Sequence, residues 1–167
     1  MKNFLKKAAI IAIAVALMNV TANAQTKGDK AIGAHIALAT GNHYSHLGIG
    51  GKFQYNILDA VRAEGSLTFY PPKDYVSMWD VSLNGHYLIP VADKITVYPL
   101  AGVGLLGARF SWEGHHSSSN SVFCLNLGGG ADYELMPNIA LNAELKYKIA
   151  EDGWGRLMPS VGIAYKF

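Results

Sequence analysis

The chain has 167 residues, with 14 basic residues, 12 acidic residues and one cysteine. Its length fits one domain, and a single cysteine excludes an internal disulfide. Three basic and no acidic residues fall within the first 24 positions, so the rest of the chain carries 11 minus 12 charges, or −1, which does not support a nucleic-acid partner.

The first segment, MKNFLKKAAIIAIAVALMNVTANAQ, has the three parts of a secretory signal peptide. A start with three lysines is followed by an apolar core from Ala8 to Met18 and by the small-residue cleavage motif Ala22-Asn23-Ala24. The 11 residues of this core are fewer than the roughly 20 needed to cross a bilayer as a helix. We therefore predict a cleaved signal peptide over residues 1–24 and one mature domain over residues 25–167.

Apolar and polar residues alternate along most of the mature chain. Period two indicates strands with two unlike faces, and no stretch of ten or more residues has a convincing helical period. The alternation and the turn residues between its stretches predict an all-β domain with eight strands, near residues 30–40, 46–57, 60–70, 76–88, 94–110, 122–134, 139–150 and 158–167.

The connections alternate in length. Those after the second, fourth and sixth predicted strands are short, while those after the first, third, fifth and seventh are longer or richer in loop residues. Long and short connections on opposite rims fit an antiparallel, eight-stranded, up-and-down transmembrane β-barrel of an outer membrane. Both mature termini would then lie on the short-turn, periplasmic side.

Alternation by itself does not say whether the apolar face meets lipid or encloses a ligand, as it does in a soluble barrel of the lipocalin kind. The aromatic residues favour lipid, because two aromatic bands around an aliphatic belt match the two interfaces of a bilayer. The predicted bands are Phe69, Tyr75, Trp79, Phe110, Trp112, Phe123, Tyr147 and Trp154 near the long-loop rim, and Phe53, Tyr55, Tyr87, Tyr98, Tyr133, Tyr165 and Phe167 near the other rim.

The opposite face is predicted to fill the barrel with charged and polar side chains. An eight-stranded barrel has an interior just wide enough for side chains, so we expect paired charges and no channel of porin size. The predicted inward residues are Lys52, Gln54, Arg62, Glu64, Asp80, His86, Asp132, Glu134, Glu144, Lys146, Lys148 and Lys166.

Partners within this interior depend on where the hairpins turn. A tip near Lys73 would place Arg62 opposite Asn84, Glu64 opposite Ser82 and Ser66 opposite Asp80. A turn near Gly153 would place Asn142 opposite Lys166.

The ending SVGIAYKF, with apolar residues at every second position up to Phe167, resembles the assembly signal of outer-membrane barrels. The stretch YLIPVADKITVYPLAGVGLLGA is similar to the fourth and fifth strands of small porin-family barrels. Over residues 30–167 the chain resembles the outer membrane protein X and outer membrane protein A barrels, although we expect no peptidoglycan-binding domain after the barrel. The resemblance implies an integral protein of a Gram-negative outer membrane.

No catalytic, cofactor-binding or metal-binding residue is predicted. Ser82 and His86 are about 13 Å apart along one strand, too far for a nucleophile and its base. His43, His46, His115 and His116 are expected to be solvated loop residues, because adjacent histidines diverge on an extended chain and no further ligand stands at metal-site spacing. Cys124 is expected to be a small inward filler on the same face as Asn126.

The sequence thus predicts a monomeric, non-enzymatic outer-membrane barrel with a structural or interaction role in the cell envelope. Its expected partners are outer-membrane lipid and the barrel-assembly machinery, which would recognise the last strand ending at Phe167. Two alternatives remain open at this point: a lipid-modifying barrel enzyme and a soluble periplasmic ligand-binding barrel.

Overall fold

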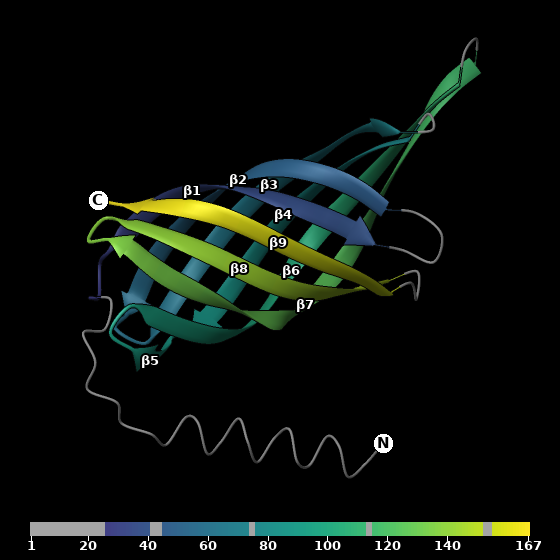
Figure 1. Ribbon diagram of the computed structural model, residues 1–167. Helices are drawn as coiled ribbons and strands as arrows, with labels where there is room; N and C mark the ends of the chain where they lie inside the picture. Colours follow the sequence, from purple (N-terminus) through teal and green to yellow (C-terminus); the bar gives the residue numbers. More distant parts are fainter. Residues whose placement is uncertain (1–25, 41–44, 74–75, 113–114, 152–154) are drawn as a thin grey trace.

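The computed structural model describes residues 26–40, 45–73, 76–112, 115–151 and 155–167, so the predicted signal peptide lies outside the described residues. None of the described residues belongs to a helix that is long and apolar enough to cross a membrane. Nine β-segments form a closed barrel (Figure 1). They are β1 (Lys30–Thr40), β2 (Ser45–Leu58), β3 (Val61–Lys73), β4 (Val76–Tyr87), β5 (Ile89–Ala92), β6 (Ile95–Trp112), β7 (His115–Met136), β8 (Ile139–Ala150) and β9 (Gly155–Lys166).

The nine segments make an eight-stranded antiparallel barrel, as predicted. Both β4 and β5 pair with β6, and only Leu88 separates them, so they act as one interrupted strand. Every other segment pairs with its neighbours in the chain, and β1 pairs with β9 to close the ring. Closure satisfies the backbone hydrogen bonds at both sheet edges, which a lipid environment demands.

The two rims of the barrel differ. Two-residue connections follow β2, β5 and β7, and they contain the turn formers Asp59, Asp93 and Asn138. At the opposite end β6 and β7, with 18 and 22 residues, form a hairpin that projects past the other strands (Figure 1). We call these ends the short-turn rim and the long-hairpin rim. The chain ends at the short-turn rim, where the amide of Phe167 donates to the carbonyl of Lys30 at 2.9 Å.

The predicted register was wrong in two hairpins. Arg62 lies opposite His86 rather than Asn84, because β3 runs to Lys73 and the β3–β4 connection is centred on residues 74–75. Likewise Glu64 faces Asn84, and Ser66 faces Ser82. Asn142 lies opposite Gly162 rather than Lys166. Each shift is an even number of residues, so every side chain keeps its predicted face while its cross-strand partner changes.

The apolar face points outward over the whole ring. Leu83, Leu125 and Val161, for example, keep 60%, 49% and 60% of their surface exposed, whereas the alternate residues are buried. Among the predicted aromatic bands, Phe69, Trp79, Phe123 and Tyr147 are exposed on the long-hairpin side, as are Phe53, Tyr55, Tyr87, Tyr133, Tyr165 and Phe167 on the other.

The prediction that Tyr98 belongs to the outward aromatic band is wrong, because its side chain is 2% exposed and points into the barrel. Segment β6 is apolar on both faces near this point, so its alternation gave no sign of direction. The side chains of Phe110 and Trp112, and Tyr75 and Trp154 entirely, lie outside what the structure describes.

Candidate functional site: the charged barrel interior

A lysine bridges two carboxylates at the centre of the barrel. The ammonium of Lys52 on β2 lies 3.4 Å from Glu64 on β3 and 3.1 Å from Glu144 on β8. It also donates to Asn142 Oδ1 at 2.7 Å, and Lys146 pairs with Glu144 at 3.2 Å. All five side chains are buried. Because a buried charge without a partner is costly, this network requires all of its members together.

Arg62 organises a second cluster nearer the short-turn rim. Its Nη1 lies 2.6 Å from Asp132 Oδ2, and its Nη2 and Nε lie 3.0 and 3.2 Å from His86 Nδ1. A guanidinium can only donate, so His86 Nδ1 accepts and the ring proton sits on Nε2, 3.9 Å from Glu64 Oε1. His86 therefore lies beside the central network without a hydrogen bond to Glu64, and the hydroxyl of Tyr98 on Glu144 is the hydrogen bond that joins the two groups.

Tyr98 packs against both His86 and Arg62 in this cluster. Its ring stacks on that of His86, with centroids 4.6 Å apart and planes 5° from parallel, and the guanidinium carbon of Arg62 lies 4.7 Å from its centroid. The hydroxyl donates to Glu144 at 3.1 Å. Gly130, opposite Tyr98 on β7, leaves room for the ring, since a Cβ there would approach it to 2.7 Å.

Two further ion pairs complete the interior. Lys148 pairs with Asp80 and donates to Ser82 Oγ at 2.7 Å, while Ser82 donates to Asp80 at 2.7 Å. Lys166 pairs with Glu134 at the short-turn rim, where both are half-buried. The ion pairs of the described residues thus join five cations to five carboxylates: Lys52, Arg62, Lys146, Lys148 and Lys166, and Glu64, Asp80, Asp132, Glu134 and Glu144.

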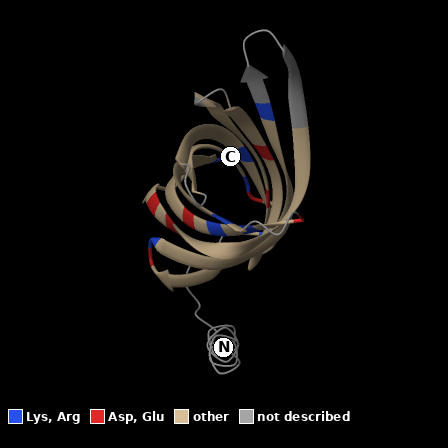
Figure 2. Ribbon diagram, turned by 90° about the vertical axis from the view of Figure 1, so that its right-hand side faces the viewer, with Lys and Arg blue, Asp and Glu red and all other residues tan. Residues whose placement is uncertain are grey.

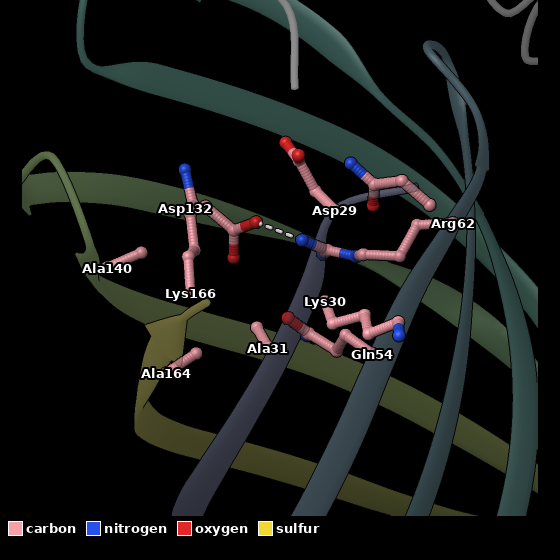
Figure 3. A pocket seen from close by; sticks show the side chains of 10 residues that line it. Asp29, Lys30, Ala31, Gln54, Arg62, Asp132, Ala140, Ala164 and Lys166 are labelled. Atoms are coloured by element: carbon pink, nitrogen blue, oxygen red, sulfur yellow. Dashed lines mark hydrogen bonds and ion pairs between the residues drawn. The ribbon is translucent and has the colours of Figure 1, made fainter. Parts of the chain in front are cut away.

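The short-turn mouth leads into a very small cavity (Figure 3). The Arg62–Asp132 pair, Gln54 and Lys166 line it, and its volume is about 10 Å³, roughly the space that one water requires. Figure 2 shows the charged positions distributed over strands around the barrel wall. The charged side chains converge on the barrel interior from several strands.

One group of buried side chains has the composition of a metal site. Possible ligand atoms of Glu64, His86 and Glu144 lie within 4.8 Å of one another. The ammonium of Lys52, however, contacts both carboxylates and already supplies the positive charge that a metal ion would bring. The donor set therefore fits an ion-pair network better than a metal centre.

The comparisons with known proteins agree with this fold. A family model described as outer membrane protein beta-barrel domain matches residues 8–167. The chain belongs to this outer membrane β-barrel family. It is therefore an integral outer-membrane protein, and the exposed apolar belt is its lipid-facing surface. No curated protein matches the sequence.

Solved outer-membrane barrels share the fold at low sequence identity. Ail, the attachment invasion locus protein of Yersinia pestis, is 20% identical with a TM-score of 0.62, over 85% of this chain and 100% of that one. The N-terminal barrel of Pseudomonas aeruginosa OprF is 20% identical with a TM-score of 0.67, over 86% and 100%. Neisserial surface protein A is 18% identical with a TM-score of 0.65, over 83% and 96%.

The interior of this outer-membrane barrel contains all twelve residues predicted to face inward. Ten are buried, and Glu134 and Lys166 are half-buried. Cys124 is buried beside Asn126 on the same face, as predicted. The prediction that His46 is a solvated loop residue is wrong, because it lies in β2 and is 8% exposed. His43 and the side chains of His115 and His116 lie outside the described part of the chain.

Tyr98 and His35 are among the inward residues that were not anticipated. Tyr98 is the centre of the Arg62 cluster, and His35 on β1 contacts Thr68 Oγ1 at 2.8 Å. The parity of His35 with Ala31 and Ala37 places all three on one face, so period two along 30–40 was the available signal. For Tyr98 no such signal exists, because Leu100 and Leu106 on its face are as apolar as the outward residues.

Proposed function

We propose that the protein is a closed, non-catalytic, monomeric barrel with a structural or interaction role in the cell envelope, in which the barrel anchors the β6–β7 hairpin. The observation that carries this proposal is the contrast between an interior filled by paired charges and a hairpin that extends beyond the other strands. A filled interior suits an anchor better than a route for solutes.

The arrangement of polar groups supports a non-catalytic role. Lys148, Ser82 and Asp80 form hydrogen bonds of the kind that can activate a serine. Their exposed fractions are 1%, 2% and 3%, and they point into the filled interior, away from the lipid on which a barrel enzyme would act. In this setting the trio stabilises the wall.

The proposed orientation places the short turns in the periplasm and the hairpin on the cell surface, as in bacterial barrels with short periplasmic turns. In a Cys124→Ala background, an impermeant maleimide should label Asn120→Cys on the hairpin of intact cells and leave Asp93→Cys unlabelled. Both positions are exposed, and they lie at opposite rims. Labelling of Asp93→Cys alone would reverse the orientation, while permeabilised cells, in which both should react, provide the control.

Assembly is proposed to use the last strand as a signal to the barrel-assembly machinery. Leu157, Val161, Ile163, Tyr165 and Phe167 are exposed on one face of the chain end, and Phe167 also bonds to β1 at the closing seam. Deleting Phe167 should reduce the amount of folded protein in the outer membrane several-fold, measured as the heat-modifiable band on a gel. Deleting Gln25 at the other end serves as the control, and an undiminished yield without Phe167 would contradict the proposal.

A further inference from the structure

The sheet that carries the projecting hairpin has two edges at the long-hairpin rim (Figure 1). β2 pairs with β3 only as far as Phe69. β8 bonds to β7 only as far as Phe123, whose carbonyl accepts from the amide of Glu151 at 3.0 Å. Beyond these points the ladders that join β3, β4, β6 and β7 continue, and no described residue adds a further strand to β3 or to β7.

The two edges differ in their protection against pairing. The edge on β3 contains Pro71, Pro72 and Lys73. Proline has no N–H to donate, and proline and lysine are residues with which natural proteins keep an edge strand from pairing with other chains. The edge on β7, residues 118–122, reads SSNSV and contains no proline and no charged residue. The β3 edge is therefore blocked, while the β7 edge is able to accept a strand.

The ladders show which backbone groups of β7 point to its open edge. Backbone direction alternates from residue to residue along an antiparallel strand. The carbonyl of Phe123 bonds to Glu151, so the odd-numbered residues of β7 face the side of β8. The ladder with β6 is regular over residues 118–122, so this alternation is kept. Ser119 and Ser121 therefore direct two N–H and two C=O groups at the open edge.

The residues of this edge indicate what kind of strand would fit. Asn120 and Ser121 are exposed, so the edge is accessible from water. The short side chains of serine leave room for larger side chains opposite, and β-branched residues and threonine are favourable cross-strand partners. Since residues 118–122 carry no charge, they offer a charged segment no ion pair.

We propose that the β7 edge at Ser119 and Ser121 binds an extended, uncharged segment of another protein, rich in threonine and valine, as an added strand. Main-chain hydrogen bonds would supply the affinity, as in other cases of strand addition to a sheet edge. The added strand would continue the position of β8 beyond Glu151. The proposal names the partner class for the interaction role proposed above, and it rests on the hairpin lying at the cell surface.

Hydrogen exchange of the protein in lipid nanodiscs tests whether the edge is open. The amides of Ser119 and Ser121 point to the edge, while those of Asn120 and Val122 point to β6. Ser119 and Ser121 should exchange about tenfold faster than Asn120 and Val122, the order expected for one missing hydrogen bond. Equal protection of the four amides would mean that the edge is already covered, and the proposal would be overturned.

Selection from a random decapeptide phage library on the protein in nanodiscs tests the partner class. The selected peptides should be uncharged and rich in threonine and valine, and the best of them should slow exchange at Ser119 and Ser121. Ser121→Pro, which removes one N–H from the edge, should weaken its binding at least about tenfold, whereas Ser121→Ala, which keeps this N–H, should not. Ser119→Pro and Ser119→Ala form a second matched pair, and the heat-modifiable band confirms that each variant is folded.

Three outcomes of this selection would overturn the proposal: no enriched peptide, enriched peptides that are charged, or binding that both proline variants retain. If the proline variants instead convert a cross-linked dimer of the protein into a monomer, the occupant is a second copy and the partner class is wrong. Peptide binding to the purified protein does not depend on its orientation in the cell. Binding together with a hairpin that maleimide places in the periplasm would therefore support the edge site and reject the surface role.

Discussion

Replacing Glu144 by alanine is expected to lower the free energy of unfolding by about 3 to 5 kcal/mol, the usual cost of removing one member of a buried ion pair. Glu144 is 5% exposed, and it contacts Lys52, Lys146 and the hydroxyl of Tyr98. Its loss leaves Lys146 without its partner and Lys52 with one carboxylate instead of two. Urea titration of the protein folded in lipid vesicles measures the effect.

The matched control is Glu151→Ala, which removes an exposed carboxylate just beyond the end of β8. This change should alter the free energy of unfolding by no more than about 0.5 kcal/mol. Equal effects of the two substitutions would mean that the interior charges are hydrated and not paired, and the account of a filled interior would fail.

Introducing arginine at Leu145 is expected to destabilise the barrel by about 2 to 4 kcal/mol, the cost at the bilayer midplane. Leu145 lies in the middle of β8 and is 50% exposed on the lipid-facing side. Arginine at Leu141, which faces lipid beside Tyr133 near the short-turn rim, should cost only about 0 to 1 kcal/mol, because its head can reach the interface.

Leu145→Ala separates charge from lost leucine surface in this series. In unfolding titrations in vesicles, Leu145→Ala should have a clearly higher free energy of unfolding than Leu145→Arg. If Leu145→Arg and Leu141→Arg destabilised the protein equally, the placement of the aromatic bands at the two membrane interfaces would be contradicted.

The face of nearly every side chain could be predicted from the sequence, because a strand has a strict period of two. Lys146 and Lys148 alternate with Leu145 and Tyr147, and one polar residue is enough to assign both faces of such a strand. In the part of β6 around Tyr98, both faces are apolar, so alternation does not indicate which face points inward. Tyr98 was therefore assigned to the wrong face because β6 is apolar on both sides there. As a result, its place at the centre of the Arg62 cluster was not predicted.

Cross-strand partners were less predictable, because register depends on the exact tip of each hairpin. The shifts in β3–β4 and β8–β9 leave all faces unchanged and still replace the partner of Arg62 by His86 and that of Asn142 by Gly162. Contacts across the barrel, such as those of Lys52 with Glu144, join strands that are not neighbours in the sheet. They depend on the diameter of the barrel and the tilt of its strands, and a local pattern of residues predicts neither.

Conductance across a planar bilayer is the most direct test of the central claim that the barrel is closed by its own charges. Purified protein inserted into the bilayer should give no stable channel of porin size, because ion pairs together with buried neutral and apolar side chains occupy the interior. Heat-denatured protein added in the same detergent is the control for insertion artefacts. A steady, large conductance from the folded protein would contradict the filled interior and assign the barrel to transport.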